Sequence, residues 1–215
     1  MPRRTLPLVN HEYYHIYNRG VAKQPIFTSV RHYQRFLKTL LYYQLRQEPV
    51  RFSQFDPQKH LIDTTQRRVE IICYCLMPNH FHLLLRQTQD GGISEFISKF
   101  TNSYTKYYNT KELRVGTLLQ GVFKAVHLGT EEQLLHLSRY IHLNPVTGFI
   151  VRRLADYRWS SYPEYIGLVP TNFCQKEVVL NQFASVDAYR SFVLDQADYA
   201  KRLGQIKHQA LDADR

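Results

Sequence analysis

The spacing of hydrophobic residues predicts strands in three stretches of the chain. The segment EYYHIYN at residues 12–18 is rich in aromatic and β-branched side chains, which is typical of a strand, and Arg19-Gly20 ends it. RVEIICYCLM at 68–77 has the same character and leads through the turn residues Pro78-Asn79 into a strand that begins with HFHLLL. A further strand is expected over roughly Thr117 to His127.

Three other stretches have the three- and four-residue apolar spacing of amphipathic helices. The first covers about Val30 to Arg46 and the second about Ile93 to Asn109. The third begins near Thr130, which forms a capping pair with Gln133, and is expected to stop at Pro145. The inner stripe of the first helix is formed by Phe36, Leu37, Leu40 and Leu41.

The order of these elements predicts the fold class. One strand and one helix, then two strands and one helix, then one strand and one helix is the split βαβ pattern of ferredoxin-like folds. We therefore expect an α+β domain with a ferredoxin-like antiparallel sheet and helices on one face, plus a C-terminal helical appendage. The domain is expected to cover residues 1–166 and the helical extension residues 167–215, while residues 47–67 form a polar loop.

His80 and His82 are the first candidate site residues. Successive side chains of a strand alternate between its faces, so the two imidazoles point to one side and Phe81 to the other. Two imidazoles on one face can hold a metal ion, since histidine is the commonest metal ligand. The alternative is that both are ordinary half-buried histidines beside a core.

Tyr140 and Asn144 are the second pair of candidates. They lie one turn apart on the same face of the third helix, with Cβ atoms within about 6 Å. A phenolate oxygen can attack phosphorus, and an Asn carbonyl can complete a metal shell begun by two histidines. The alternative is that Tyr140 is one of many packing residues, since the chain has 16 tyrosines.

Several segments, in order along the chain, together resemble a known family. They are HEYYHIYNRGVAKQPIF, LMPNHFHLLL, ISEFISKFTNSYTKYYN, GTLLQGVFKAVHL, RYIHLNPV and YRWSSYPEY. Their order and spacing resemble the single-tyrosine HUH (IS200-like) transposases, in which U is a hydrophobic residue. The resemblance is greatest to the REP-associated tyrosine transposases, which act on single-stranded DNA hairpins.

The resemblance implies a function and a set of site residues. His80, His82 and, less directly, Asn144 would hold one divalent ion, Mg²⁺ or Mn²⁺, and Tyr140 would be the nucleophile. The enzyme would nick and rejoin single-stranded DNA at hairpin (REP-like) sequences through a 5′-phosphotyrosine. Two alternatives remain open: a domesticated hairpin-DNA-binding protein without strand transfer, and an unrelated metal-dependent hydrolase in which water attacks.

The charge of the chain favours nucleic acid as its partner. Its 215 residues include 28 Lys and Arg against 18 Asp and Glu, a formal net charge of +10. From Asp187 onward five basic residues balance five acidic ones, so the excess lies in residues 1–186. No apolar run approaches the roughly 18 residues that span a bilayer, so no membrane partner is expected.

Five basic residues are candidates for DNA contact. Arg19 and Lys23 follow a strand beside a glycine, where a backbone can approach DNA closely, although they could equally be solvated loop charges. Lys99, Lys106 and Lys124 are the other candidates. The aromatic stripe between the lysines is expected to pack on the sheet; it consists of Phe96, Phe100, Tyr104 and Tyr107.

The cysteines and the first residues predict a reducing compartment. Cys73, Cys75 and Cys174 do not form a zinc pattern, and the first two share one face of a strand, so buried free thiols are expected. The start of the chain, MPRRTLPLVNHEYY, lacks the apolar stretch of a secretory signal, so a cytoplasmic location is expected. The sequence is compatible with a monomer or a homodimer.

Overall fold

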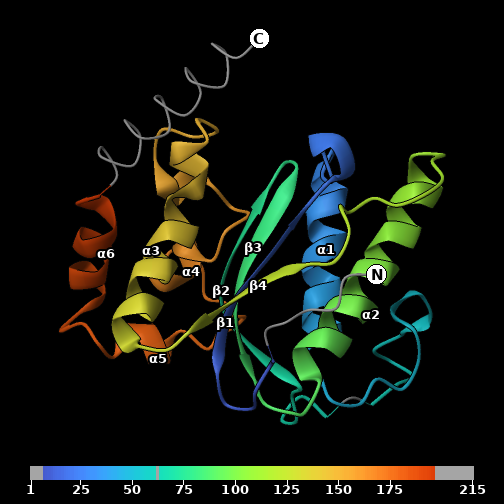
Figure 1. The fold of residues 1–215 in the computed structure, drawn as a ribbon, viewed down its shortest axis with the longest axis horizontal. Helices are drawn as coiled ribbons and strands as arrows, with labels where there is room; N and C mark the ends of the chain where they lie inside the picture. Colours follow the sequence, from blue (N-terminus) through green and yellow to red (C-terminus); the bar gives the residue numbers. More distant parts are fainter. Residues whose placement is uncertain (1–6, 62, 197–215) are drawn as a thin grey trace.

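A four-stranded antiparallel sheet forms the centre of the computed structural model, which describes residues 7–61 and 63–196 (Figure 1). Its strands are β1 (Tyr13–Arg19), β2 (Val69–Met77), β3 (His80–Gln87) and β4 (Lys124–Leu128). They are hydrogen-bonded in the order β2-β3-β1-β4. Each neighbouring pair is antiparallel, as the split βαβ pattern requires, and the predicted ferredoxin-like α+β fold is confirmed.

Helices cover both faces of this sheet (Figure 1), so the expectation of helices on one face alone is wrong. α1 (Val30–Tyr43) and α2 (Gly92–Lys111) lie on one face, as expected for the two helices of the split βαβ unit (Figure 1). α3 (Glu131–Thr147) packs against β2, β3 and β4 from the other face. The remaining helices are α4 (Tyr162–Tyr165), α5 (Glu177–Leu180), α6 (Val186–Leu194) and the short 3-10 turns η1 (Val21–Lys23), η2 (Phe52–Gln54) and η3 (Leu154–Asp156).

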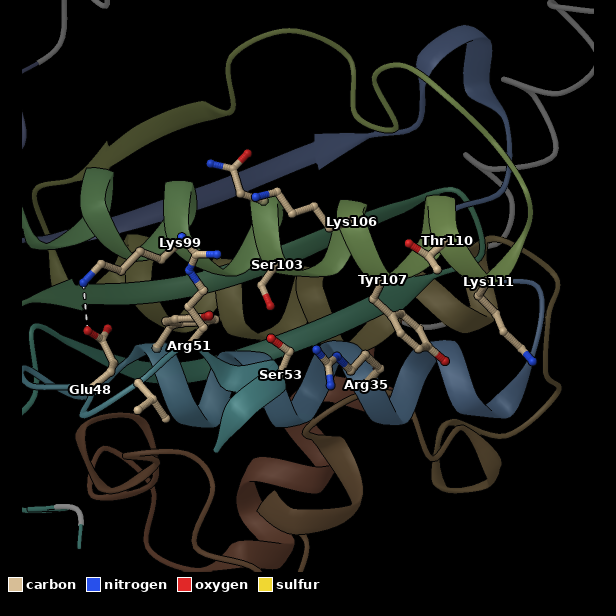
Figure 2. A pocket seen from close by; sticks show the side chains of 13 residues that line it. Arg35, Glu48, Arg51, Ser53, Lys99, Ser103, Lys106, Tyr107, Thr110 and Lys111 are labelled. Carbon is tan, nitrogen blue, oxygen red and sulfur yellow. Dashed lines mark hydrogen bonds and ion pairs between the residues drawn. The ribbon is translucent and has the colours of Figure 1, made fainter. Parts of the chain in front are cut away.

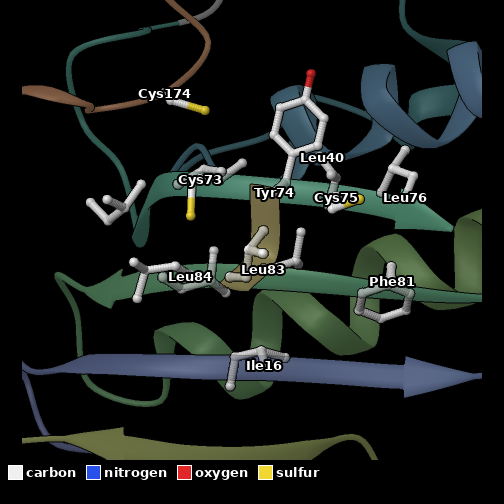
Figure 3. Packing of buried hydrophobic residues seen from close by; sticks show 14 of the residues in the cluster. Ile16, Leu40, Cys73, Tyr74, Cys75, Leu76, Phe81, Leu83, Leu84 and Cys174 are labelled. Atoms are coloured by element: carbon white, nitrogen blue, oxygen red, sulfur yellow. The ribbon is translucent and has the colours of Figure 1, made fainter. Parts of the chain in front are cut away.

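The core between the sheet and the first two helices is aromatic. Phe81 of β3 lies with its ring centroid 5.3 Å from that of Phe36 and 5.8 Å from that of Phe100. The strand residues around it are equally buried (Figure 3). The expected packing of the α2 stripe is confirmed for Phe96, Phe100 and Tyr104, all fully buried, whereas Tyr107 is only half-buried.

Two predicted helix features are wrong in detail. Leu41 was expected on the inner stripe of α1 but is 41% exposed, because the buried face of the last turn is formed by its neighbours Leu40, Tyr42 and Tyr43. α3 does not stop at Pro145 but continues to Thr147. Proline lacks the N–H that would bond the carbonyl of Ile141, and the side-chain amide of Asn144 approaches that carbonyl at 3.5 Å instead.

The start of α3 has the predicted cap. The hydroxyl of Thr130 accepts a hydrogen bond from the backbone N–H of Gln133 (3.2 Å), and the Gln133 side chain accepts one from the N–H of Gly129 (2.8 Å). The strand before it is shorter than expected, since β4 begins only at Lys124. Residues 117–123 form a loop beside the end of β1, where Gly20 and Leu119 form an isolated bridge and the backbone N–H of Gln120 donates to the carbonyl of Arg19 (2.8 Å).

The segment after α3 runs along the free edge of β2. The hydroxyl of Tyr157 donates to the carbonyl of Leu76 (2.5 Å), and that of Tyr165 donates to the carbonyl of Ile72 (2.8 Å). The aromatic residues of the YRWSSYPEY segment therefore pack against β2 and cover the exposed edge of the sheet. The division at residue 166 stays a prediction, and residues 197–215 of the expected extension lie outside the described residues.

All three cysteines are buried free thiols, as expected. Among residues 7–61 and 63–196, no helix has the length and hydrophobicity that crossing a bilayer requires.

Candidate functional site

The candidate site is a cleft of about 1170 Å³ at the ends of β1 and β3, closed on one side by α3 and on another by the loop before β4. Antiparallel pairing of the two strands sets His82 opposite Tyr17 and His80 opposite Arg19, so all four side chains emerge on the α3 face. Residues from segments far apart in sequence line it: Tyr17, Arg19, Lys23, His80, His82, Lys124 and Tyr140.

His80 and His82 stand side by side on β3. Their ring centroids are 5.0 Å apart and their planes are nearly perpendicular (88°). In each ring Nδ1 has a partner: that of His80 lies 2.6 Å from Oδ1 of Asn79, and that of His82 lies 2.9 Å from Nε2 of His15. The Nε2 atoms of both rings therefore remain for a ligand, which is the usual arrangement for metal-binding imidazoles.

Burial keeps these imidazoles neutral. Desolvation, and then the charge of Arg19, lower the pKa of His80 to about 4. Desolvation lowers the pKa of His82 well below its ordinary value, with smaller contributions from His80 and His15. Only the neutral imidazole has a lone pair for a metal, so both rings are in the ligand-ready form at pH 7.

Tyr140 projects from α3 over the histidines. Its ring centroid is 5.5 Å from that of His82, edge-on at 82°, and its side chain is 51% exposed. Partial burial raises the pKa of its phenol, while a hydrogen bond with Asn144 lowers it. The group is therefore a protonated phenol at neutral pH, accessible from the cleft and within reach of the His pair.

Asn144 occupies a different position from the other three site residues. It is 8% exposed and does not line the cleft. Its Nδ2 donates to the backbone carbonyl of Tyr140 (2.8 Å), which leaves the carbonyl oxygen of the amide as the only atom that could bind a metal. The two histidines thus fit a divalent ion, and Asn144 as third ligand stays a prediction.

His15 is a site residue that the sequence analysis missed. Its ring stacks on that of His82 with centroids 5.1 Å apart, and desolvation lowers its pKa to about 4. The sequence does contain a pattern that points to His15: His15 and Tyr17 are two residues apart in β1 and share a face of the strand, as His80 and His82 do in β3. What the sequence could not supply was the register that sets the two strands together. Within the described residues, no three His, Cys, Asp or Glu side chains form a metal-binding group.

The five basic candidates fall into two groups. Arg19, Lys23 and Lys124 line the cleft, and Nε of Arg19 donates to the side chain of Gln120 (2.6 Å). The turn that carries Lys23 has no room for a larger residue at Gly20, since a Cβ there would lie 2.2 Å from the carbonyl oxygen of Gln24.

Lys99 and Lys106 are not brought to this cleft. Both lie on α2, on the other face of the sheet, where they line a separate groove (Figure 2). Nζ of Lys99 is 2.8 Å from carboxylate oxygens of both Glu48 and Glu95. Their roles in DNA contact stay predictions.

Comparison with known proteins supports the resemblance drawn from the sequence. Residues 58–144 match the family model described as transposase IS200 like. The chain resembles IS200-like transposases. This match runs from before β2 to the last turn of α3 and contains His80, His82, Tyr140 and Asn144.

The fold of this protein also resembles that of a solved structure. A structure described as the REP-associated tyrosine transposase bound to a REP hairpin superposes with a TM-score of 0.59 at 16% sequence identity. The similarity covers 79% of this chain and 89% of that one. No curated protein sequence matches the chain.

Proposed function

We propose that this protein nicks and rejoins single-stranded DNA beside hairpins, with Tyr140 as the nucleophile. The observation that carries the proposal is the convergence of two neutral histidines on β3 and a tyrosine on α3 in one cleft with basic walls. The similarity to IS200-like transposases supports the reaction class, and the hairpin bound by the solved counterpart supports the form of the substrate.

Each group in the cleft has a distinct part in this reaction. Arg19, Lys23 and Lys124 bind the phosphates on either side of the scissile bond. Nε2 of His80 and of His82, with the Asn144 carbonyl as the third ligand, would hold Mg²⁺ or Mn²⁺. When bound, such an ion polarises a phosphate oxygen and lowers the pKa of a nearby hydroxyl.

The chemical step is a transesterification. Oη of Tyr140 forms a bond to phosphorus, and the bond from phosphorus to the 3′-oxygen breaks, leaving a 5′-phosphotyrosine. The phenolic proton is lost and the leaving 3′-oxygen gains one, so the step is balanced without a further reactant. Because the ester is conserved in the protein–DNA link, attack by a 3′-hydroxyl reverses it and rejoins strands.

His15 completes the site as a positioning residue. If Nε2 of His82 binds a metal, its Nδ1 carries the proton and donates to Nε2 of His15, 2.9 Å away. His15 thereby holds the His82 ring in the tautomer and orientation that the ligand needs.

Covalent trapping tests the proposal. Wild-type protein mixed with an end-labelled hairpin carrying a single-stranded flank should give an SDS-stable adduct in manganese buffer, and Tyr140→Phe should give none while still binding the DNA. Tyr13→Phe, which changes another half-buried tyrosine that lies outside the cleft, is the matched control and should form the adduct normally. An adduct with Tyr140→Phe would exclude this nucleophile.

The same assay separates the alternatives. A hairpin-binding protein without strand transfer would bind the oligonucleotide without an adduct or a nick. A hydrolase that uses water would nick it without an adduct. Equal nicking of the same sequence as perfect duplex would contradict the single-stranded substrate.

A further inference from the structure

A second groove, of about 890 Å³, lies between α1, α2 and the loop around η2, on the face of the sheet away from the His–Tyr cleft (Figure 2). Its walls carry five cations and one carboxylate. These residues are Arg35, Arg51, Lys99, Lys106, Lys111 and Glu48. The groove therefore has the charge of a site for a polyanion.

Most of this charge is uncompensated. Lys99 is paired with Glu48 and Glu95, which also contact Arg68. Arg51, Lys106 and Lys111 have no ion pair within the described residues, and all three are exposed. Three free cations thus face one groove whose only carboxylate is already shared.

Arg35 is held ready for an anion at the floor of the groove. Its guanidinium carbon lies 4.2 Å from the ring centroid of Phe52 and 5.1 Å from that of Tyr107. Rings that cover the faces of a guanidinium leave its N–H groups, which point outward in the plane, to bind oxygen. Its Nε is buried and has no hydrogen-bond partner among the described residues.

The groove and the His–Tyr cleft are joined by a third hollow along α2. This hollow shares Asn18, Gly121 and Val122 with the cleft, and Asn102 with the groove. Between these ends α2 contributes a row of small hydrogen-bonding side chains, Ser98, Thr101, Asn102 and Thr105. The hollow is also lined by apolar residues, among them Leu119 and Val122, so a track with polar and apolar walls leads from Tyr140 around the edge of the domain to the basic groove.

We propose that this track binds the single-stranded flank of the DNA whose scissile phosphate lies at Tyr140. The inference rests on the proposed function. A track that turns from one face of a small domain to the other excludes duplex, because DNA is stiff over about 150 base pairs, whereas a single strand can follow it. Cations and hydroxyls contact phosphates irrespective of base, so the flank is bound without sequence preference.

Fluorescence anisotropy tests the track separately from the chemistry. The protein carries Tyr140→Phe, and the ligands are a labelled hairpin without a flank and hairpins with flanks of about 4, 10 and 16 nucleotides on either side. Affinity should rise with the length of one flank. Arg51→Gln with Lys111→Gln should remove most of that gain and lower the log–log salt slope for the long ligand by about 1.4, two phosphates at about 0.7 each.

The matched control removes the same charge elsewhere. Arg152→Gln with Arg190→Gln changes two exposed arginines outside the track and should keep the dependence on flank length. Equal behaviour of the two double variants would overturn the track, as would a gain that follows added base pairs in the stem instead of unpaired flank. Failure to bind even the unflanked hairpin would contradict the proposed function itself.

Discussion

Two polar clusters of this protein differ in how their charges and lone pairs are satisfied. One lies where α1 ends and α2 begins and consists of full charges that neutralise one another. The other lies between the sheet and α3 and consists of neutral rings with unused lone pairs. Polar groups of the first kind stabilise the fold, whereas polar groups of the second kind are available to bind a ligand.

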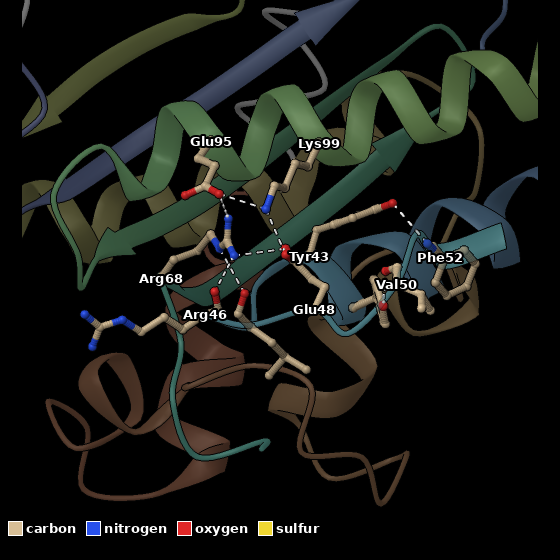
Figure 4. A network of polar contacts seen from close by, with 10 residues as sticks. Tyr43, Arg46, Glu48, Val50, Phe52, Arg68, Glu95 and Lys99 are labelled. Atoms are coloured by element: carbon tan, nitrogen blue, oxygen red, sulfur yellow. Dashed lines mark hydrogen bonds and ion pairs between the residues drawn. The ribbon is translucent and has the colours of Figure 1, made fainter. Parts of the chain in front are cut away.

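The first cluster is built around Arg68, whose side chain is 1% exposed (Figure 4). Its guanidinium contacts Glu95 and lies 3.0 Å from Glu48, and its Nε and Nη2 donate to the carbonyls of Leu45 and Arg46. Every charge here has an opposite charge beside it. A buried ion that is paired in this way fixes the positions of its partners and leaves little free to react.

The second cluster contains His15, His80, His82 and Tyr140. Among the described residues no carboxylate lines the cleft, and burial keeps the pKa values of the three imidazoles below the ordinary range. The imidazole nitrogens of these histidines are shielded from water, and because they stay unprotonated they keep their lone pairs. The second cluster is therefore poised for a cation, whereas the first already contains its own.

The largest effect is expected from removing the two β3 histidines of the second cluster. His80→Ala with His82→Ala should reduce cleavage of a flanked hairpin to background and abolish the heat of Mn²⁺ binding in isothermal titration. Affinity for the DNA should change little, because most of it comes from phosphate neutralisation. EDTA should reproduce the variant, and full cleavage in EDTA would contradict a metal site.

Removing the centre of the first cluster should instead weaken the fold. Arg68→Met leaves Glu48 and Glu95 paired with Lys99 alone within the described part of the chain, and losing one partner of a buried pair costs about 3–5 kcal/mol of unfolding free energy. Unfolding of the wild type and the variant in urea measures this loss of free energy. Arg153→Met, which breaks an exposed pair with Asp156, is the control and should cost at most about 1 kcal/mol. Similar losses for both would show that Arg68 is not structural.

The pH dependence of stability should come from buried neutral imidazoles. Burial lowers the pKa of His142 to about 3, and its ring lies 2.7 Å from the Tyr189 hydroxyl and 2.8 Å from that of Ser161. Its folded-state pKa is below the unfolded value near 6.5, so its contribution is complete above that pH and is lost as the pH falls toward 3.

Between pH 6.5 and 5 this loss is about 2 kcal/mol for His142 alone. Thermal unfolding at a series of pH values measures it, and His142→Gln should show a shallower slope in that window. Parallel curves for wild type and variant would mean that His142 does not titrate on unfolding.

The smallest effect is expected at His15. His15→Phe keeps a ring beside His82 but removes the acceptor for its Nδ1–H, and loss of such a support typically weakens metal binding 10–100-fold. His15→Gln retains an acceptor and should recover part of the affinity. Isothermal titration with Mn²⁺ compares the three proteins, and unchanged affinity in His15→Phe would show that His82 needs no orientation from β1.

The local pattern of the sequence was enough to predict the element order and to place His80 and His82 side by side. Alternation along a strand puts His80 and His82 on one face wherever that strand lies, and the turn at Pro78-Asn79 is encoded by its own residues. The capping pair at Thr130 is likewise local. These predictions needed no knowledge of which segments meet.

Contacts between distant segments were decided only by the tertiary structure. The sequence around Lys99 predicts an unpaired cation on a helix, but Lys99 donates a hydrogen bond to Glu48, which lies 51 residues earlier in the chain. His15 and His82 are 67 residues apart and meet through the β1–β3 register. The side chain of Asn144 turns to its own helix, beside a proline that removes a backbone donor. Periodicity tells which face a residue occupies, but the partner on that face is chosen by packing, and the partner determines whether a charge or lone pair is free.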